Sequence, residues 1–139
     1  MASELRVNTL RGVSTAGSIS VVAEGNTNTT NLQQGLTKVW VNFDGSATDA
    51  ERRDSFNVSG MTDNGTGDYT TSFTNNMGDT NYCHLVHAIV ASNYTQYLAN
   101  NFAKATSSYR EEQDSFDGSS TTTNRDHTAC NLGILGDLA

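Results

Sequence analysis

The stretch Lys38–Tyr82, KVWVNFDGSATDAERRDSFNVSGMTDNGTGDYTTSFTNNMGDTNY, decides the fold of this chain. Apolar and polar residues alternate along it, the alternation breaks at turn-forming dipeptides, and it then resumes. Alternation with a period of two is typical of half-buried strands, and Asx-Gly pairs between such runs favour hairpin turns. The large side chains of the stretch are Trp40, Phe43, Phe56, Val58, Tyr69 and Phe73. We therefore predict antiparallel β-structure, with a tight turn at Asn64-Gly65.

The sequence after this stretch predicts further strands. The run 82–91, YCHLVHAIVA, is the longest apolar segment, and we expect it at the centre of a sheet. Residues 128–135 are predicted as the closing strand and 113–124 as a polar loop, while 94–98 and 102–105 are consistent with either strand or short helix. Several short strands joined by turns imply an all-β sandwich or barrel, and of these we predict an antiparallel β-sandwich of the jelly-roll type.

The first thirty-five residues are different, because they contain too few large apolar side chains to form a core of their own. A short alternating segment opens the chain, a brief strand is expected at 19–23, and 24–35 is a polar loop or linker. We therefore predict an extended N-terminal arm, 1–35, and a β-sandwich domain, 36–139. The apolar residues of the arm must pack on the domain, on a sister subunit or on a larger assembly.

The charge and composition exclude several partners. The formal net charge is −7 and the pI is about 4.6, so attraction to nucleic acid is not expected. No run approaches the eighteen or so apolar residues of a membrane span, and we expect no membrane insertion. Ser, Thr and Asn make up about a third of the chain, a composition that suits turns and strands.

Cysteine and histidine spacing gives no metal pattern. Cys83 and Cys130 are read as buried free thiols, with a disulfide open if their strands are neighbours. Neither the Cys83–His87 spacing nor the His127–Cys130 spacing matches a zinc site, and no H-x-H pair is present for iron. We expect no metal ion and no cofactor.

The carboxylates give no catalytic pattern either. Asp44, Asp49, Glu51 and Asp54 lie close to two arginines, which favours solvated ion pairs over a tuned acid and base. The sequence has no G-x-S-x-G, no P-loop and no G-x-G-x-x-G. We expect that the protein is not an enzyme.

Three segments of the chain, WVNFDG at 40–45, RDSFNVS at 53–59 and TDNGTGDYT at 62–70, resemble a module that recurs in virion fibre proteins of tailed bacteriophages, marine phages and cyanophages especially. The segment ACNLGILGD at 129–137 resembles the closing strand of such modules. The opening SELRVNTLRG is similar to the S-E-I-R-V-N/D-x-L start of many such phage proteins.

This resemblance implies a virion structural protein made in the host cytoplasm. The arm would attach it to other virion proteins of the tail or capsid, and the domain would form the knob of a trimeric short fibre or tail fibre. A capsid head decoration or fibre protein with no receptor role is the alternative. The arm residues predicted to be buried between the chains of the homotrimer are Leu5, Val7, Leu10, Ile19 and Val21.

A contact of the knob with the host surface, a glycan for instance, is a further expectation. Exposed polar loops on a rigid β-scaffold commonly present binding groups. The residues predicted for this contact are Tyr94, Tyr97, Tyr109, Asp114 and Asp117. The alternative reading, which the strand spacing favours, places these tyrosines at core or interface positions.

Overall fold

The computed structural model describes residues 4–12, 19–23, 25, 27–89, 95–116 and 122–139, and of 95–102 and 122 it describes the backbone course alone. The chain divides into two compact units, Met1–Leu36 and Thr37–Ala139, a boundary one residue from the predicted one. No helix in the described part of the chain is long and apolar enough to cross a membrane.

The N-terminal unit contains a two-stranded antiparallel ribbon and one helical turn. Strand β1 (Ser20–Val22) pairs with β2 (Thr29–Asn31), and α1 (Leu32–Gly35) follows directly. The side chain of Asn31 caps this turn by accepting a hydrogen bond from the N–H of Gln34 at 3.2 Å. The segment predicted as a loop or linker therefore contains a strand and a capped turn. None of the residues described in this unit is buried.

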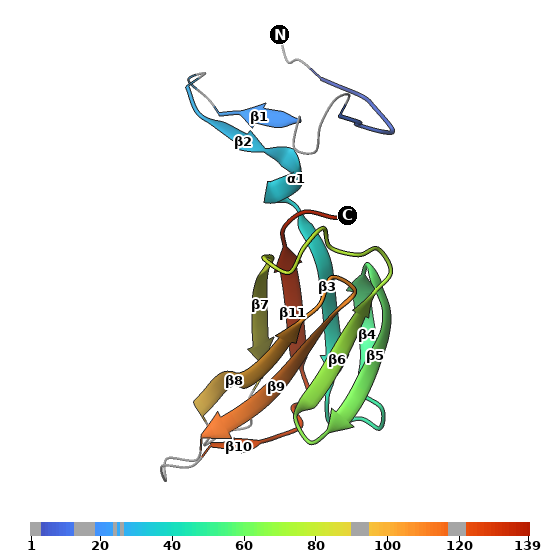
Figure 1. The fold of residues 1–139 in the computed structure, drawn as a ribbon, viewed down its shortest axis with the longest axis vertical. Helices are drawn as coiled ribbons and strands as arrows, with labels where there is room; N and C mark the ends of the chain where they lie inside the picture. Colours follow the sequence, from blue (N-terminus) through green and yellow to red (C-terminus); the bar gives the residue numbers. More distant parts are fainter. Residues whose placement is uncertain (1–3, 13–18, 24, 26, 90–94, 117–121) are drawn as a thin grey trace. The chain divides into compact units, whose positions relative to one another are not determined.

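The second unit is a sandwich of two antiparallel sheets, which confirms the predicted all-β fold (Figure 1). The first sheet has the strand order β4-β3-β11-β7, with β3 and β11 in the middle. Its strands are β3 (Thr37–Asp44), β4 (Glu51–Phe56), β7 (Cys83–Ala88) and β11 (Cys130–Leu135).

The second sheet has the order β10-β9-β6-β5, and β8 is a further partner of β9. One edge of β9 pairs with β8, and the other edge pairs with β6 over residues 108–112 and with β10 over residues 114–116. Its strands are β5 (Val58–Gly65), β6 (Asp68–Phe73), β8 (Thr95–Lys104), β9 (Ser108–Phe116) and β10 (Thr122–Asn124). Strand β9 is therefore the centre of this sheet, because it has ladder partners along both edges.

The core lies between the two sheets and follows the alternation in the sequence. On β3, Val39, Val41 and Phe43 are at most 1% exposed. The intervening residues of that strand lie on the outer face. From the second sheet, the ring of Tyr69 meets that of Phe43 edge to face at a centroid distance of 5.0 Å. The other buried apolar residues are Ala50, Phe73, Met77, Tyr82, Ala88, Tyr109, Cys130, Leu132 and Ile134.

The prediction that 82–91 forms the centre of a sheet was wrong. Strand β7 is an edge strand that pairs only with β11 among the described strands. Only one face of it points to the core, so Leu85 is 60% exposed whereas Ala88 is buried. The apolar run did not distinguish a central strand from an edge strand because hydrophobicity alone says nothing about ladder partners.

The hairpin turn lies two residues beyond its predicted position. Gly65 still belongs to β5 and pairs with Asp68, so the turn consists of Thr66 and Gly67. Gly67 has a φ of +69° and Gly65 a φ of +138°, and both values favour glycine. A register shift between Asp63 and Gly65 accommodates the extra residue on β5.

The two cysteines lie on neighbouring strands but do not form a disulfide. Cys130 pairs with Ala88 at one end of the β7–β11 ladder, and Cys83 pairs with Leu135 at the other end. Five residues of ladder separate the two positions, on the order of 16 Å, which no disulfide spans. Both thiols are free; Cys130 is buried as predicted, whereas Cys83 is exposed, contrary to the prediction.

Candidate functional site

The apolar residues predicted to bind the arm into an assembly are mostly exposed in the single chain. Leu5 is 79% exposed, Val7 55%, Leu10 56% and Val21 51%, while Ile19 is partly buried. Val22 and Leu36 of the same unit are also more than half exposed. A role of these residues in trimer formation or virion attachment remains a prediction.

The prediction that Tyr109 and Asp114 lie on exposed polar loops and contact a receptor was wrong, as was the prediction that the loop begins at residue 113. These residues are 1% and 4% exposed, because 108–116 is the central strand β9 and not a loop. Tyr109 points into the core and stacks near His84 at a ring distance of 4.9 Å. Tyr97 pairs with Asp114 along the backbone, and its side chain lies outside the described structure. Tyr94 and Asp117 lie outside the described residues.

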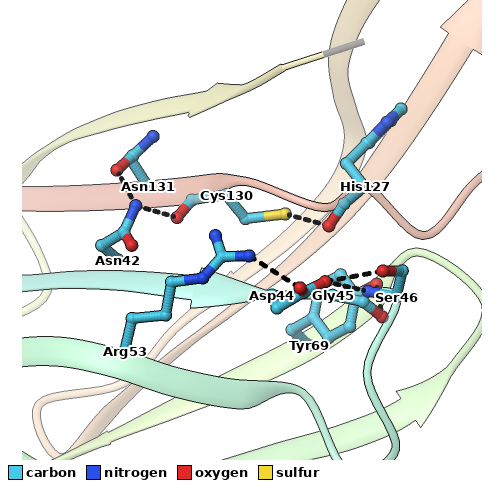
Figure 2. Close-up of polar contacts among 9 residues, drawn as sticks. All are labelled: Asn42, Asp44, Gly45, Ser46, Arg53, Tyr69, His127, Cys130 and Asn131. Carbon is cyan, nitrogen blue, oxygen red and sulfur yellow. Dashed lines mark hydrogen bonds and ion pairs between the residues drawn. The ribbon is translucent and has the colours of Figure 1, made fainter. Parts of the chain in front are cut away.

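A polar cluster lies at the end of the sandwich where β3 ends and β11 begins, called here the distal end (Figure 2). Asp44, the last residue of β3, accepts hydrogen bonds from the N–H and hydroxyl of Ser46 at 3.0 and 2.6 Å. It also forms an ion pair with Arg53 of β4 at 2.7 Å, which confirms the predicted ion pairing for this one of the four carboxylates. The hydroxyl of Ser46, followed by the backbone and Arg53, lowers the pKa of Asp44.

Tyr69 joins the two sheets at the distal end. Its hydroxyl lies 2.7 Å from Oδ1 of Asp126 and 3.0 Å from the carbonyl oxygen of Gly45. The N–H of Gly67 donates to the same Asp126 oxygen at 2.7 Å, and the N–H of Gly45 donates to the carbonyl of His127 at 2.9 Å. Burial, followed by the hydrogen bond to Asp126, raises the pKa of Tyr69 far above its usual value. The phenol therefore stays protonated and acts as a structural donor.

A second polar chain lies in the core beside this cluster. The side-chain amide of Gln113 donates to Oε1 of Glu111 at 3.0 Å, and the thiol of Cys130 lies 3.1 Å from Oε1 of Gln113. Oε2 of Glu111 has no hydrogen-bond partner among the described residues. Burial raises the pKa of Glu111 to about 7, so the carboxyl is partly protonated at neutral pH.

Burial favours the uncharged forms of Cys130 and His127, the thiol and imidazole beside these two clusters. Burial raises the pKa of Cys130 to about 11, and burial together with Arg125 lowers the pKa of His127. A protonated thiol is a poor nucleophile, and a neutral imidazole 5% exposed is poorly placed to meet a substrate. The arrangement therefore ties the sheets together and does not resemble a tuned acid–base or nucleophilic site.

Sequence reasoning missed the polar core residues Glu111 and Gln113, although one signal was available. Tyr109, Glu111, Gln113 and Ser115 alternate along one strand, so a core position for the tyrosine places the others on the same face. The polar composition of the segment indicated a loop instead. No group of three or more metal-ligating side chains occurs among the residues that the structure describes.

Comparison with known proteins gave no relatives: no family model, no curated protein and no solved structure matches this chain.

Proposed function

We propose that this chain is a structural protein of a tailed-bacteriophage virion, a trimeric short fibre or tail-fibre knob attached through its N-terminal arm. The observation that supports this proposal most is the contrast between the two units. All residues of the buried core belong to the second unit, whereas Leu5, Val7 and Leu10 of the first are more than half exposed. These side chains would leave water if the arm packed against further chains or against other virion proteins.

Alternation favours an assembly formed by strand-like segments. Leu5 and Val7 lie two residues apart, so in an extended segment they share one face. In a trimer with threefold symmetry, each arm would make the same contact with its neighbour. The apolar faces of the three arms would then be buried against one another around the axis. The resemblance of the opening SELRVNTLRG to phage proteins supports the same role for the arm.

The host-contact part of the prediction adds nothing to this proposal. Of its five residues, Tyr109 and Asp114 are buried, and the remaining three have no described side chain. The proposal therefore depends on the arm's contacts with other chains and with the virion. A capsid decoration protein would use its arm for the same contacts. Only the position of the protein in the particle distinguishes these two forms.

Sedimentation equilibrium of the full chain tests the proposal. We expect a trimer at micromolar concentration, and we expect the variant Leu5→Ser/Val7→Ser/Leu10→Ser to be monomeric with an unchanged β-sheet spectrum. The matched control is Leu85→Ser, which removes an equally exposed apolar side chain from the sandwich and should remain trimeric. A monomeric wild-type chain would overturn the trimer. Antibody labelling of particles that contain the protein then separates a tail from a capsid position.

A further inference from the structure

The two sheets of the sandwich have different outer faces. On the sheet β4-β3-β11-β7, Phe56, Trp40, Gly133 and Leu85 are direct cross-strand neighbours and form one apolar row across all four strands. Phe56 is 53% exposed, Trp40 38% and Leu85 60%. The outer face of the other sheet has polar residues at comparable positions, such as the cross-strand row Thr62, Thr70 and Arg110. Among the side chains that the structure describes, the exposed aromatics Trp40 and Phe56 thus lie on one face.

A polar row runs beside the apolar one, and on every strand its member lies two residues from the member of the apolar row. Asp54, Asn42, Asn131 and His87 are its members, again in direct register. The amide of Asn42 donates to Oδ1 of Asn131 at 2.7 Å, and Figure 2 shows these two amides facing one another. This bond fixes the orientation of both amides. Oδ1 of Asn42 is thereby positioned as an acceptor and Nδ2 of Asn131 as a donor.

Gly133 leaves a notch in the apolar row between Trp40 and Leu85. A Cβ built on Gly133 would lie 3.9 Å from Cβ of Leu85, an ordinary contact, and the backbone of Gly133 has no positive φ. Neither packing nor backbone conformation therefore requires glycine at this position. The missing side chain leaves the strand backbone open to a ligand beside the indole.

We propose that this outer face binds a neutral oligosaccharide. The C–H face of a sugar ring would stack on Trp40 and Phe56, and its hydroxyls would bond to the Asn42–Asn131 pair one row away. The two rows are separated by roughly 7 Å along the strands, and the apolar row is about 14 Å long, dimensions that suit a short chain of sugar rings lying across the strands.

Size and charge favour this ligand over the alternatives. The apolar row is only about 14 Å long and lies directly beside a polar row that includes Asp54, whereas the core of a stable protein interface is larger and is depleted in charged residues. A second copy of the chain is therefore a poorer fit than a small elongated ligand. The chain has a net charge of −7 and the polar row includes a carboxylate, Asp54, so an anionic glycan or a phosphate would be repelled.

The test does not depend on the proposed virion role, because it uses the purified full chain. Trp40 is the only tryptophan, so its fluorescence reports directly on this face. We expect a saturable change with at least one of three neutral probes, cellotriose, maltotriose or tri-N-acetylchitotriose. A trigalacturonate of similar length should bind about tenfold more weakly or not at all.

Calorimetry with the best probe then compares variants whose melting curves match the wild type. Trp40→Ala and Gly133→Ala should each weaken binding by about tenfold or more, whereas Thr70→Ala on the opposite sheet should bind like the wild type. Absence of binding by all three neutral probes would overturn the proposal, as would a Trp40→Ala or Gly133→Ala variant that binds equally well. Self-association of the wild type that Trp40→Ala abolishes, without glycan binding, would assign the face to a second copy instead.

Discussion

The hydroxyl of Tyr69 donates a hydrogen bond of 2.7 Å to Oδ1 of Asp126, across 57 residues of sequence. This contact joins the start of β6, in one sheet, to the segment that precedes β11, in the other. Because the N–H of Gly67 donates to the same oxygen, one carboxylate fixes both a strand and its hairpin turn. The distal end of the sandwich is therefore held by directional bonds as well as by apolar contact.

Replacing Tyr69 with Phe should lower the free energy of unfolding by about 1–2 kcal/mol, because the ring is retained but its buried hydrogen bond is lost. Urea denaturation followed by circular dichroism measures the change. Ser72→Ala, on the outer face of the same strand, is the matched control and should stay within about 0.5 kcal/mol of the wild type. Equal stability of Tyr69→Phe and the control would show that the Asp126 contact contributes nothing.

Three glycines of one hairpin should respond differently to alanine. At Gly67, with a φ of +69°, a Cβ would lie 2.6 Å from the carbonyl oxygen of Gln113, so we expect a loss of about 3 kcal/mol or more. At Gly65 the φ of +138° is strained for alanine but the space is open, so about 1 kcal/mol is expected. Gly60 has open space and no positive φ, so Gly60→Ala should be nearly neutral.

Thermal or urea unfolding of the three variants gives this order directly. If Gly65→Ala proved as harmful as Gly67→Ala, the turn would be centred on the Asn64-Gly65 pair, as the sequence suggests. A neutral Gly67→Ala would mean that the backbone of β9 does not pass beside the turn.

Glu111 should make stability fall as pH rises. Burial raises its pKa from 4.5 to about 7, so between these values the folded state binds a proton that the unfolded state has released. The free energy of unfolding therefore decreases from about pH 4.5 to about pH 7 and levels off above that. Asp68 acts at lower pH: the hydrogen bond from Arg110 lowers its pKa, and its contribution is lost as pH falls below 3.8.

Glu111→Gln tests this effect, because it keeps the shape of the side chain and removes the titration. We expect its stability relative to the wild type to improve by one to a few kcal/mol, in order of magnitude, between about pH 5 and about pH 8. Urea denaturation at these pH values measures the difference. A wild type and variant with parallel pH profiles would mean that Glu111 is not desolvated.

The two thiols should differ strongly in reactivity. Cys83 is exposed, whereas Cys130 is 0% exposed and burial raises its pKa to about 11. Ellman's reagent should therefore modify one thiol of the native protein quickly and the second only after unfolding. Cys83→Ser should abolish the fast phase and Cys130→Ser should leave it intact. A native protein without any fast thiol would indicate that Cys83 is covered or bonded.

The sequence alone determined the class of fold and the position of several elements. The alternation Val39, Val41 and Phe43 predicted a strand with one buried face, and that strand is β3. The low apolar content of 1–35 predicted a segment without its own core, and the structure has its boundary at Leu36. Such features depend on the period of two and on local composition, which residues near in sequence are sufficient to define.

Only the tertiary structure decided which strands are central and which side chains meet. Strand β7 looks central by hydrophobicity and lies at an edge, while the polar segment around Glu111 forms the central strand β9. The apolar row that contains Trp40 and the polar row that contains Asn42 exist because β3, β4, β7 and β11 pair in one register. Register and strand order depend on pairings between residues far apart in the chain. The pattern of residues along one strand does not say which other strand will pair with it.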